Sequence, residues 1–438
     1  MKRVIISLCF FASLFVHSTL AYIAGGDSLF VYDVTNTDSV YKVGGACVTS
    51  NYDGNFHPAY DVWVKGHYAY LAVGRSLDGW AIYGGGIIVY DVSDSTDPYW
   101  VGENLLTEGD GYNLYIQGTL IYLVTKDAES WGPHDSIYHY DGGIYIYDIS
   151  DPLHPVLEDS MTLPGDPRDV FVDSQYVYVG TEDSLFIFTF PPQGIEEDNN
   201  SNKPIIRVEG SRLTIQFTGS EQAKVDIGIY DVLGRRLKSI KKDITTGNNL
   251  ISIDISGLKN GVYFLPLHIN NNVYRNKFIK IGNRIDVKNA TVKTSYKYQL
   301  HRISAMGINA DCVCAIPGYV FVTPDSNGVR SIDVTDPYHP VKKGRVDGSV
   351  KGLFINDSLL YTNGGLEIIN ISDPANPYII SSKQLTKALP SGLKGIKVLG
   401  SNAYFTGGYL VIYDISNPNS PCSLYTSNYN NAWDLFVR

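Results

Sequence analysis

Carboxylates recur at one place in a repeated phrase of this sequence, and paired carboxylates are the groups that many hydrolases use for acid and base chemistry. They are Asp91, Asp148, Asp333 and Asp414. Each ends an apolar run and precedes a polar turn, where an aspartate bonds nearby backbone groups. One such residue per repeat favours turn formation over catalysis. Since the chain also lacks the common hydrolase, zinc-protease, phosphate-loop and EF-hand patterns, we expect no catalytic residue.

A second set of chemically capable residues lies in three long polar stretches, 45–58, 74–86 and 126–143. The candidate binding residues, here called the loop rim, are His57, Trp80, Tyr83, Trp131, His134, His139 and Tyr140. Aromatic and histidine side chains on loops of a rigid scaffold suit stacking on a glycan or contact with a protein. The same rings would also order long loops by packing on one another, and both interpretations stay open.

Metal and disulfide chemistry have weak support. Two histidines of the loop rim, His134 and His139, have aspartates nearby in the sequence. This pattern is more often found in solvated loops than in metal sites, so we expect neither a metal nor a cofactor. The cysteines that follow residue 21 are Cys47, Cys312, Cys314 and Cys422. On a strand, Cys312 and Cys314 share a face without the geometry of an easy bridge. Buried thiols and disulfides elsewhere both remain possible.

The elements that must position these loops are internal repeats. An apolar strand followed by an Asp-Pro-x-x-Pro type of turn occupies residues 87–98, 144–155, 329–340, 366–377 and 410–421, with a degenerate copy at 29–40. A strand–turn–strand phrase precedes most copies, at 60–73, 112–125, 168–181, 351–363 and 394–407. Each unit thus has four strands, which is typical of propeller blades. We count about seven units, a usual ring size.

The two chain ends look like parts of one blade. Residues 432–438 match a lone first strand, and residues 22–34 match second and third strands without a first. Joined, they complete a blade and hide the edges that an open repeat exposes. We therefore predict an all-β fold, an about seven-bladed β-propeller closed by N- and C-terminal strands.

These repeats resemble the LVIVD-repeat family, whose motif is a strand ending in Asp followed by a Ser-Asp-Pro-x-x-Pro turn, as in IYIYDISDPLHP at 144–155. The resemblance covers nearly all of the chain after residue 21 except its middle. It implies an extracellular or surface propeller and says little about activity.

The middle of the chain, residues 195–283, resembles the type A sorting domain of the type IX secretion system. The stretches IYDVLGRRLKS, DISGLKNGVYFLPL and KFIKI carry this resemblance. The motif residues are Tyr230, Asp231, Gly234, Arg235, Gly261 and Tyr263. Alternating strands predict a small β-sandwich inserted in blade four, and the resemblance implies secretion machinery as a partner. Such domains normally end a chain, whereas three more blades follow here.

The predicted organisation is a signal peptide at 1–21, propeller blades at 22–194, the inserted sandwich at 195–283 and further blades at 284–438, with the fourth strand of blade four near 296–300. Lys2 and Arg3 precede a short apolar run, which indicates a secretory signal peptide. No later stretch reaches membrane-spanning length. A net charge of −10 argues against nucleic acid as a partner. We expect a secreted or cell-surface location.

Two classes of function follow. The first is a non-catalytic, exported binding scaffold for a protein or carbohydrate ligand, with a purely structural surface component as a variant. The alternative is an extracellular hydrolase or lyase that uses the loop-rich face. Carboxylate and histidine side chains converging on the central channel would favour the enzyme.

Replacing both Trp80 and Trp131 with Ala should abolish binding on a glycan or secretome array, because the loop rim would lose its two largest stacking surfaces. Circular dichroism should show that the variant remains folded. Persistent binding by this folded variant would contradict the loop-rim hypothesis.

Overall fold

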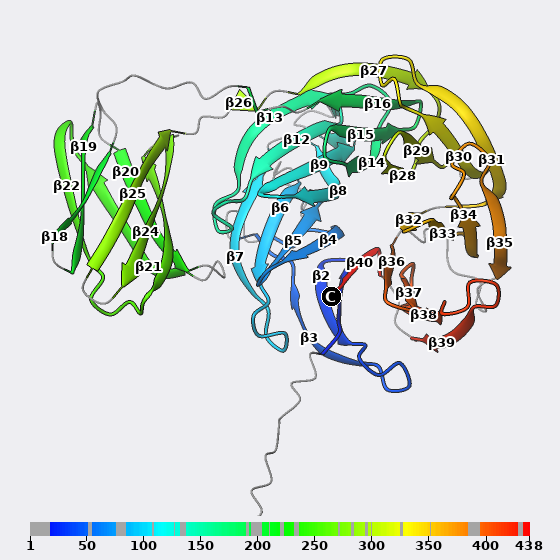
Figure 1. The fold of residues 1–438 in the computed structure, drawn as a ribbon, viewed down its shortest axis with the longest axis horizontal. Coiled ribbons are helices and arrows are strands. Elements are labelled where there is room, and N and C mark those ends of the chain that lie inside the picture. The colour runs from blue at the N-terminus through cyan, green and yellow to red at the C-terminus, as the bar shows by residue number, and fades with distance from the viewer. Residues whose placement is uncertain are drawn as a thin grey trace, which may run out of the picture.

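The structure is a computed structural model, and its described part consists of strands, turns and connecting segments. The described residues are 18–50, 55–75, 85–106, 109–126, 128–131, 137–189, 192–193, 204–209, 211–219, 223–231, 236–269, 272–281, 284–293, 297–298, 300–324, 327–350, 352–383, 395–427 and 432–438. Within them, seven four-stranded antiparallel sheets form a ring, and two further sheets form a separate sandwich (Figure 1). The prediction of an all-β propeller is confirmed.

The first four blades are built as follows, innermost strand first. Blade one has β40 (Asp434–Val437), β1 (Leu20–Gly25), β2 (Ser28–Asp33) and β3 (Tyr41–Cys47). Blade two has β4 (Ala59–Lys65), β5 (Tyr68–Val73), β6 (Gly86–Asp91) and β7 (Tyr99–Leu105). Blade three has β8 (Asp110–Gln117), β9 (Leu120–Lys126), β12 (Gly143–Asp148) and β13 (Val156–Thr162). Blade four has β14 (Pro167–Val172), β15 (Tyr176–Thr181), β16 (Ser184–Thr189) and β27 (His301–Gly307).

The last three blades follow the inserted domain. Blade five has β28 (Val313–Ile316), β29 (Tyr319–Val322), β30 (Asn327–Asp333) and β31 (Val341–Ser349). Blade six has β32 (Leu353–Asn356), β33 (Leu359–Asn363), β34 (Leu366–Asn370) and β35 (Tyr378–Lys383). Blade seven has β36 (Ile396–Leu399), β37 (Asn402–Phe405), β38 (Val411–Asp414) and β39 (Cys422–Thr426).

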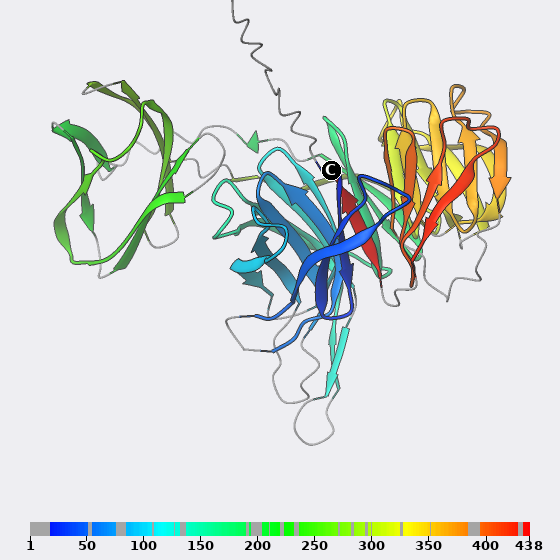
Figure 2. The same cartoon turned by 90° about the horizontal axis from the view of Figure 1, so that it is seen from below.

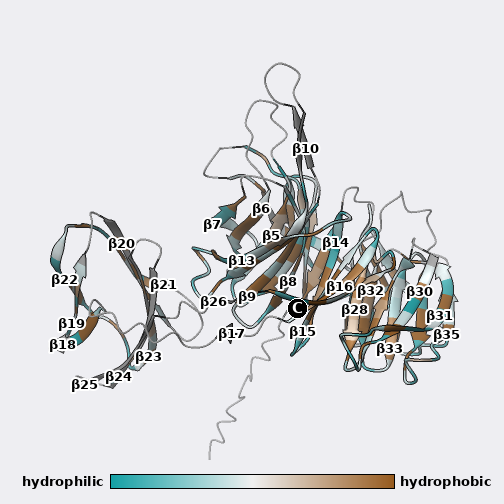
Figure 3. Cartoon of the chain, turned by 90° about the horizontal axis from the view of Figure 1, so that it is seen from above, coloured by the Kyte–Doolittle hydropathy of each residue, from teal (hydrophilic) through white to brown (hydrophobic). Residues whose placement is uncertain are grey.

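Neighbouring blades pack face to face through separate buried apolar clusters, and these clusters continue around the whole ring. The cluster between blades seven and one joins Ile23 and Tyr32 to Tyr404 and Ile412. Burying one such side chain contributes about 1.5–3 kcal/mol. Figure 3 shows apolar residues concentrated in inner strands such as β9 and β28, with polar residues toward the turns.

The chain ends close the ring by pairing β40 with β1. The antiparallel register runs from Ala21 opposite Val437 to Ala24 opposite Asp434. Beyond it, the Leu20 amide donates to the Arg438 carbonyl at 2.8 Å, and the Arg438 amide donates back at 3.0 Å. The predicted shared blade is confirmed, because each terminus satisfies the backbone groups of the other.

The recurring aspartates act in turns, as the sequence predicts. Asp91 accepts the Ser93 amide at 2.8 Å, and Asp414 accepts the Ser416 amide at 2.8 Å. Asp148 and Asp333 accept amides two residues ahead in the same way, at 2.6 and 3.1 Å. Their oxygens bond the local backbone, which is the behaviour expected of a turn-forming aspartate.

The inserted domain is a two-sheet sandwich that lies beside the ring (Figures 1 and 2). One sheet has β18 (Ile205–Glu209), β19 (Arg212–Gly219) and β22 (Gly247–Asp254). The other has β21 (Arg236–Ile244), β20 (Ala223–Asp231), β23 (Gly261–Ile269), β24 (Asn272–Ile281) and β25 (Arg284–Lys293). A short pair, β17 (Pro192–Gln193) with β26 (Lys297–Tyr298), joins the sandwich to blade four. A hairpin, β10 (Ala128–Trp131) with β11 (Ile137–Tyr140), extends blade three.

The boundary predicted at residue 283 is wrong. Ile281 pairs with Arg284, so β25 is an edge strand of the sandwich and extends this domain to Lys293. The fourth strand of blade four is β27, which pairs with β16 from Ser184 opposite Gly307 onward, and it begins after the predicted 296–300. The predicted boundary follows KFIKI, the last stretch that carries the resemblance to a sorting domain. Strand β25 lies beyond that stretch and pairs with β24 at the edge of the sheet.

Replacing residues 204–293 with a short Gly-Ser linker should leave the ring folded, because β17 and β26 still hold the two ends of the insertion together. We expect a single cooperative thermal transition, with a midpoint within about 4 °C of the ring transition in the full chain. Scanning calorimetry measures both. A broad, non-cooperative transition would show that the ring needs the insertion.

Candidate functional site

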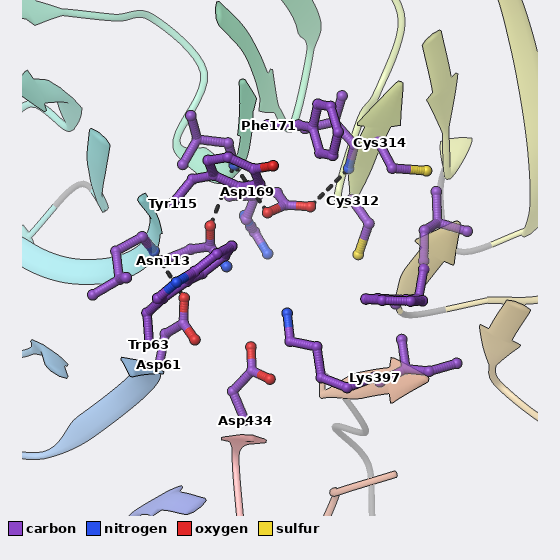
Figure 4. A pocket seen from close by; sticks show the side chains of 18 of the residues that line it. Asp61, Trp63, Asn113, Tyr115, Asp169, Phe171, Cys312, Cys314, Lys397 and Asp434 are labelled. Atoms are coloured by element: carbon purple, nitrogen blue, oxygen red, sulfur yellow. Dashed lines mark hydrogen bonds between the residues drawn. The ribbon is translucent and has the colours of Figure 1, made fainter. Parts of the chain in front are cut away.

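The innermost strands of all seven blades surround a central cavity of about 710 Å³. Successive side chains on a strand point to opposite faces, so every second residue of these strands faces the channel. Two levels of side chains result (Figure 4). In blades one to four, the first level holds the acid wall, defined as Asp61, Asn113, Asp169 and Asp434. The second level holds the aromatic level, defined as Trp63, Tyr115, Phe171, Phe354 and Phe436.

The aromatic level forms a connected belt across blades one to four. The ring centroids of Trp63 and Tyr115 lie 4.9 Å apart, and those of Tyr115 and Phe171 lie 5.1 Å apart. Phe436 of the terminal strand lies 5.5 Å from Trp63. Tilted rings at these separations attract one another and present a broad apolar surface.

Lys397 occupies the position of the aromatic level in blade seven. Its ammonium lies 5.4 Å from the Trp63 ring centroid and 5.8 Å from that of Phe354. Figure 4 shows this ammonium pointing into the cavity toward the carboxylates of the acid wall. A cation close to aromatic faces is stabilised by their quadrupoles.

Three members of the acid wall join neighbouring blades. Asp61 accepts the Leu114 amide of the next blade at 2.8 Å. Asn113 accepts the Val170 amide at 3.3 Å. Asp169 accepts the Val313 amide of the following blade at 2.7 Å. Asp61 and Asp169 thus satisfy backbone donors that face the channel. The Val170 amide is bonded by Asp169 as well, at 2.9 Å.

Asp434 differs from these three because none of its described hydrogen bonds reaches an amide of the next blade. Like Asp61 and Asp169, it accepts the amide of its own neighbour, that of Leu435, at 2.6 Å. The corresponding amide of the next blade, that of Val62, is bonded by Asp61 at 2.6 Å. Asp434 therefore faces the Asp61 carboxyl (Figure 4).

Burial raises the pKa of Asp434 well above its usual range, and the neighbouring Asp61 charge raises that pKa further. Burial also raises the Asp61 pKa, while the Lys397 charge and the Leu114 amide oppose this rise. Two carboxyls that approach in a buried site bind a proton as a pair. The geometry thus favours one shared proton, held mainly on Asp434.

The cavity is asymmetric because its blades differ at the level of the acid wall. Blades six and seven have Gly352 and Gly395 there. A Cβ on Gly395 would lie 2.6 Å from an Asp434 carboxyl oxygen and 2.3 Å from the Thr406 hydroxyl, so this position has no room for a side chain. Carboxyl groups therefore line one side of the cavity.

Blade five contributes two cysteines, Cys312 and Cys314, to the lining of the cavity. Burial raises the pKa of the Cys312 and Cys314 thiols well above their usual value, and the Asp169 charge adds to this. Both therefore stay protonated at neutral pH, which disfavours nucleophilic or metal-binding roles. Within the described part of the chain, Cys47, Cys312, Cys314 and Cys422 form no disulfide. Among the described residues, no group of three or more His, Cys, Asp or Glu side chains is placed to hold a metal.

Most of the predicted loop rim stays a prediction. Trp80, Tyr83 and His134 lie outside the described residues, as do Gly234 and Arg235 of the sorting-type motif. The hairpin β10–β11 places Trp131 opposite Ile137 and positions His139 and Tyr140 on its second strand. His57 is fully buried, with Nδ1 2.8 Å from the Gly74 carbonyl oxygen, so it orders the start of a long loop and is not exposed to a ligand.

The remaining motif residues belong to the sandwich. Tyr230 and Tyr263 are buried, and Gly261 begins β23. The backbone of Asp231 pairs with that of Tyr263. The Tyr263 hydroxyl donates to the Lys259 carbonyl at 2.6 Å, which fixes this tyrosine within its own domain.

The sequence carries a signal for the acid wall and the aromatic level. The inner strands read YDVWV, YNLYI, RDVFV and WDLFV, each with a polar residue followed two positions later by an aromatic one. Residues two apart on a strand share a face. In a ring of such strands, that shared face meets the channel.

Comparison with known families agrees with this architecture. Residues 210–281 match the secretion system C-terminal sorting domain, and residues 58–104, 138–162, 360–384 and 393–428 match the LVIVD repeat. The molecule is a closed β-propeller with a lined central cavity. It contains four regions similar to the LVIVD repeat and, between them, a domain similar to the secretion system C-terminal sorting domain.

Similarity to individual proteins is distant. The periplasmic gluconolactonase of Pseudomonas aeruginosa shares 12% identity at a TM-score of 0.45, with 96% of this chain and 99% of that chain covered. A putative 6-phosphogluconolactonase from Bacteroides uniformis shares 8% identity at a TM-score of 0.44, covering 96% and 100%. Sqt1 from Chaetomium thermophilum shares 11% identity at 0.43, covering 89% and 90%. Identities this low carry no inference about activity. No curated protein matches the sequence.

In the described part of the chain, no helix is long and apolar enough to cross a membrane.

Asp169 should make the stability of the ring depend on pH. Burial raises its pKa to about 7, above the value of about 3.9 in an unfolded chain. Between these values the folded state keeps a proton that the unfolded state has released. The free energy of unfolding should therefore fall as pH rises from about 4 to about 7, and this group should cause no further change above that range.

Urea unfolding at pH 4.5, 5.5, 6.5 and 7.5 would measure this slope. Asp169→Asn should make this slope less steep, and Asp61 and Asp434, whose pKa values burial also raises, should keep part of it. Asn113 shows that an amide suits the equivalent place in blade three. Asp97→Asn, at an exposed turn outside the cavity, should keep the wild-type slope. Equal slopes in the Asp169→Asn variant and the wild type would contradict the assignment.

Proposed function

We propose that this chain is an exported, non-catalytic β-propeller that binds a carbohydrate ligand in its central cavity. The observation that carries the proposal is the pairing of a continuous aromatic belt with hydrogen-bonding side chains inside one cavity. Its volume lies within the range of about 300–1,000 Å³ usual for small-molecule sites. The match to a secretion sorting domain supports export.

Sugar chemistry fits the two levels of the cavity. A sugar ring has an apolar C–H face that stacks on aromatic rings such as Trp63 and Tyr115. Its hydroxyl edge needs acceptors and donors, which Asp434, Asn113 and Lys397 offer around the same space (Figure 4). This site replaces the loop rim as the main proposed contact, since the described part of the rim is a hairpin and a buried histidine.

Acid–base catalysis is the second candidate, and the Asp61–Asp434 pair favours it. One protonated and one ionised carboxyl side by side is an arrangement that hydrolases use. However, both oxygens of Asp61 already accept backbone amides, those of Val62 and Leu114. A carboxylate engaged in this way is a poor general base, so binding is the better supported function.

A glycan array followed by titration calorimetry with the strongest ligand tests the proposal. Trp63→Ala should weaken binding about tenfold because it removes one stacking surface. Trp100→Ala removes a half-buried tryptophan from outer strand β7 and should leave the affinity unchanged. Wild-type affinity in Trp63→Ala, or an equal loss in both variants, would refute a cavity site.

The enzyme alternative has its own measurement. Incubating the wild type with the bound oligosaccharide should release no new reducing ends, which a colorimetric assay detects. If reducing ends appear and Asp434→Asn abolishes them, the chain is a hydrolase and the non-catalytic proposal is wrong.

A further inference from the structure

The inserted domain touches the ring through a residue of its own sorting-type motif. Tyr230, in β20, is 4% exposed, and its hydroxyl donates to Asp151 of blade three at 2.7 Å. Asp151 is 5% exposed. This hydrogen bond joins residues 79 positions apart, and it is buried at both ends.

Asp151 begins the Asp-Pro turn that recurs in the blades. One of its oxygens accepts the Leu153 amide at 3.2 Å, and the other lies 3.0 Å from His154 Nδ1. Blade five repeats this geometry: Asp336 accepts the Tyr338 amide at 3.0 Å and lies 2.8 Å from His339 Nδ1. The two turns therefore have the same internal bonding.

Burial distinguishes these turns. The Asp336 side chain is 59% exposed, whereas that of Asp151 is 5% exposed. The corresponding residues of the other described turns, Asn36, Asp94, Asp373 and Asn417, are all exposed. Only the turn of blade three has a Tyr230 hydroxyl bonded to it. The inserted domain, and not the repeat, accounts for the difference.

The short connection between the two domains keeps them close together, so even a weak contact between them is mostly formed. Pro192 pairs with Tyr298, so the two linkers leave the ring side by side. The Leu300 amide donates to Asp159 of outer strand β13 at 2.6 Å, which fixes this exit beside blade three. A short tether of this kind gives an effective concentration in the millimolar range.

We propose that the Asp151 turn of blade three is a docking site for the inserted domain, and that docking sequesters the motif residue Tyr230 from other proteins. The sorting-type domain is then a fixed part of the molecule. Other proteins can then reach only those motif residues that do not face the ring.

Hydrogen–deuterium exchange on the full chain tests this proposal, because the two matched turns form an internal comparison. In the wild type, the amides of Leu153 and His154 should exchange at least tenfold more slowly than those of Tyr338 and His339. Tyr230→Phe keeps the ring of this residue in the sandwich and removes only the bonding hydroxyl. The variant should bring the exchange of the blade-three turn close to that of the blade-five turn.

Tyr263→Phe is the matched control. It removes the other motif hydroxyl, which bonds Lys259 within the sandwich, and should leave the blade-three turn protected. Exchange in strand β22 reports whether the sandwich stays folded in both variants. Equal exchange of the two turns in the wild type, or equal effects of the two variants, would overturn the docking proposal.

Discussion

The pairing of the two chain ends is the constraint on which the rest of the molecule depends. Strand β40 is the innermost strand of blade one, yet it comes from the last residues of the chain. Asp434 and Phe436 therefore reach the channel only after the ring has closed. Because they belong to the acid wall and the aromatic level, the pairing that closes the ring also completes the lining of the cavity.

The repeats are similar where they build the fold and different where they face the channel. In the turns of blades two and seven, Asp91 and Asp414 accept the amide two residues ahead, and the aspartates of blades three and five do the same. In the inner strands, the equivalent position holds Asp61, Cys312 or Gly395. A ring of identical blades would have a symmetric pore. Because the blades differ here, carboxyl groups line one side of the cavity and Lys397 contributes an ammonium. This asymmetry favours one orientation of a bound ligand.

The acid wall both stabilises the contacts between blades and lines the cavity. Asp61 and Asp169 satisfy backbone amides of the next blade, so their presence is explained without a ligand. Asp434 is different because none of its described hydrogen bonds reaches an amide of the next blade, and its carboxyl lies beside that of Asp61. The resulting carboxyl pair is costly to ionise fully in a buried place. This buried pair in the cavity wall is the feature that packing of the blades explains least well.

The sequence by itself determined the class of the fold, the shared terminal blade and the turn role of the repeated aspartates, because these depend on local patterns and on the period of the repeat. It also carried the inner-strand alternation, from which a lined channel follows once a ring is assumed. Only the tertiary structure decided that Asp434 meets Asp61, that His57 is buried, that β25 belongs to the sandwich and that Tyr230 bonds Asp151. These contacts join residues far apart in the chain, and which distant side chains meet depends on blade packing and domain placement rather than on any local pattern.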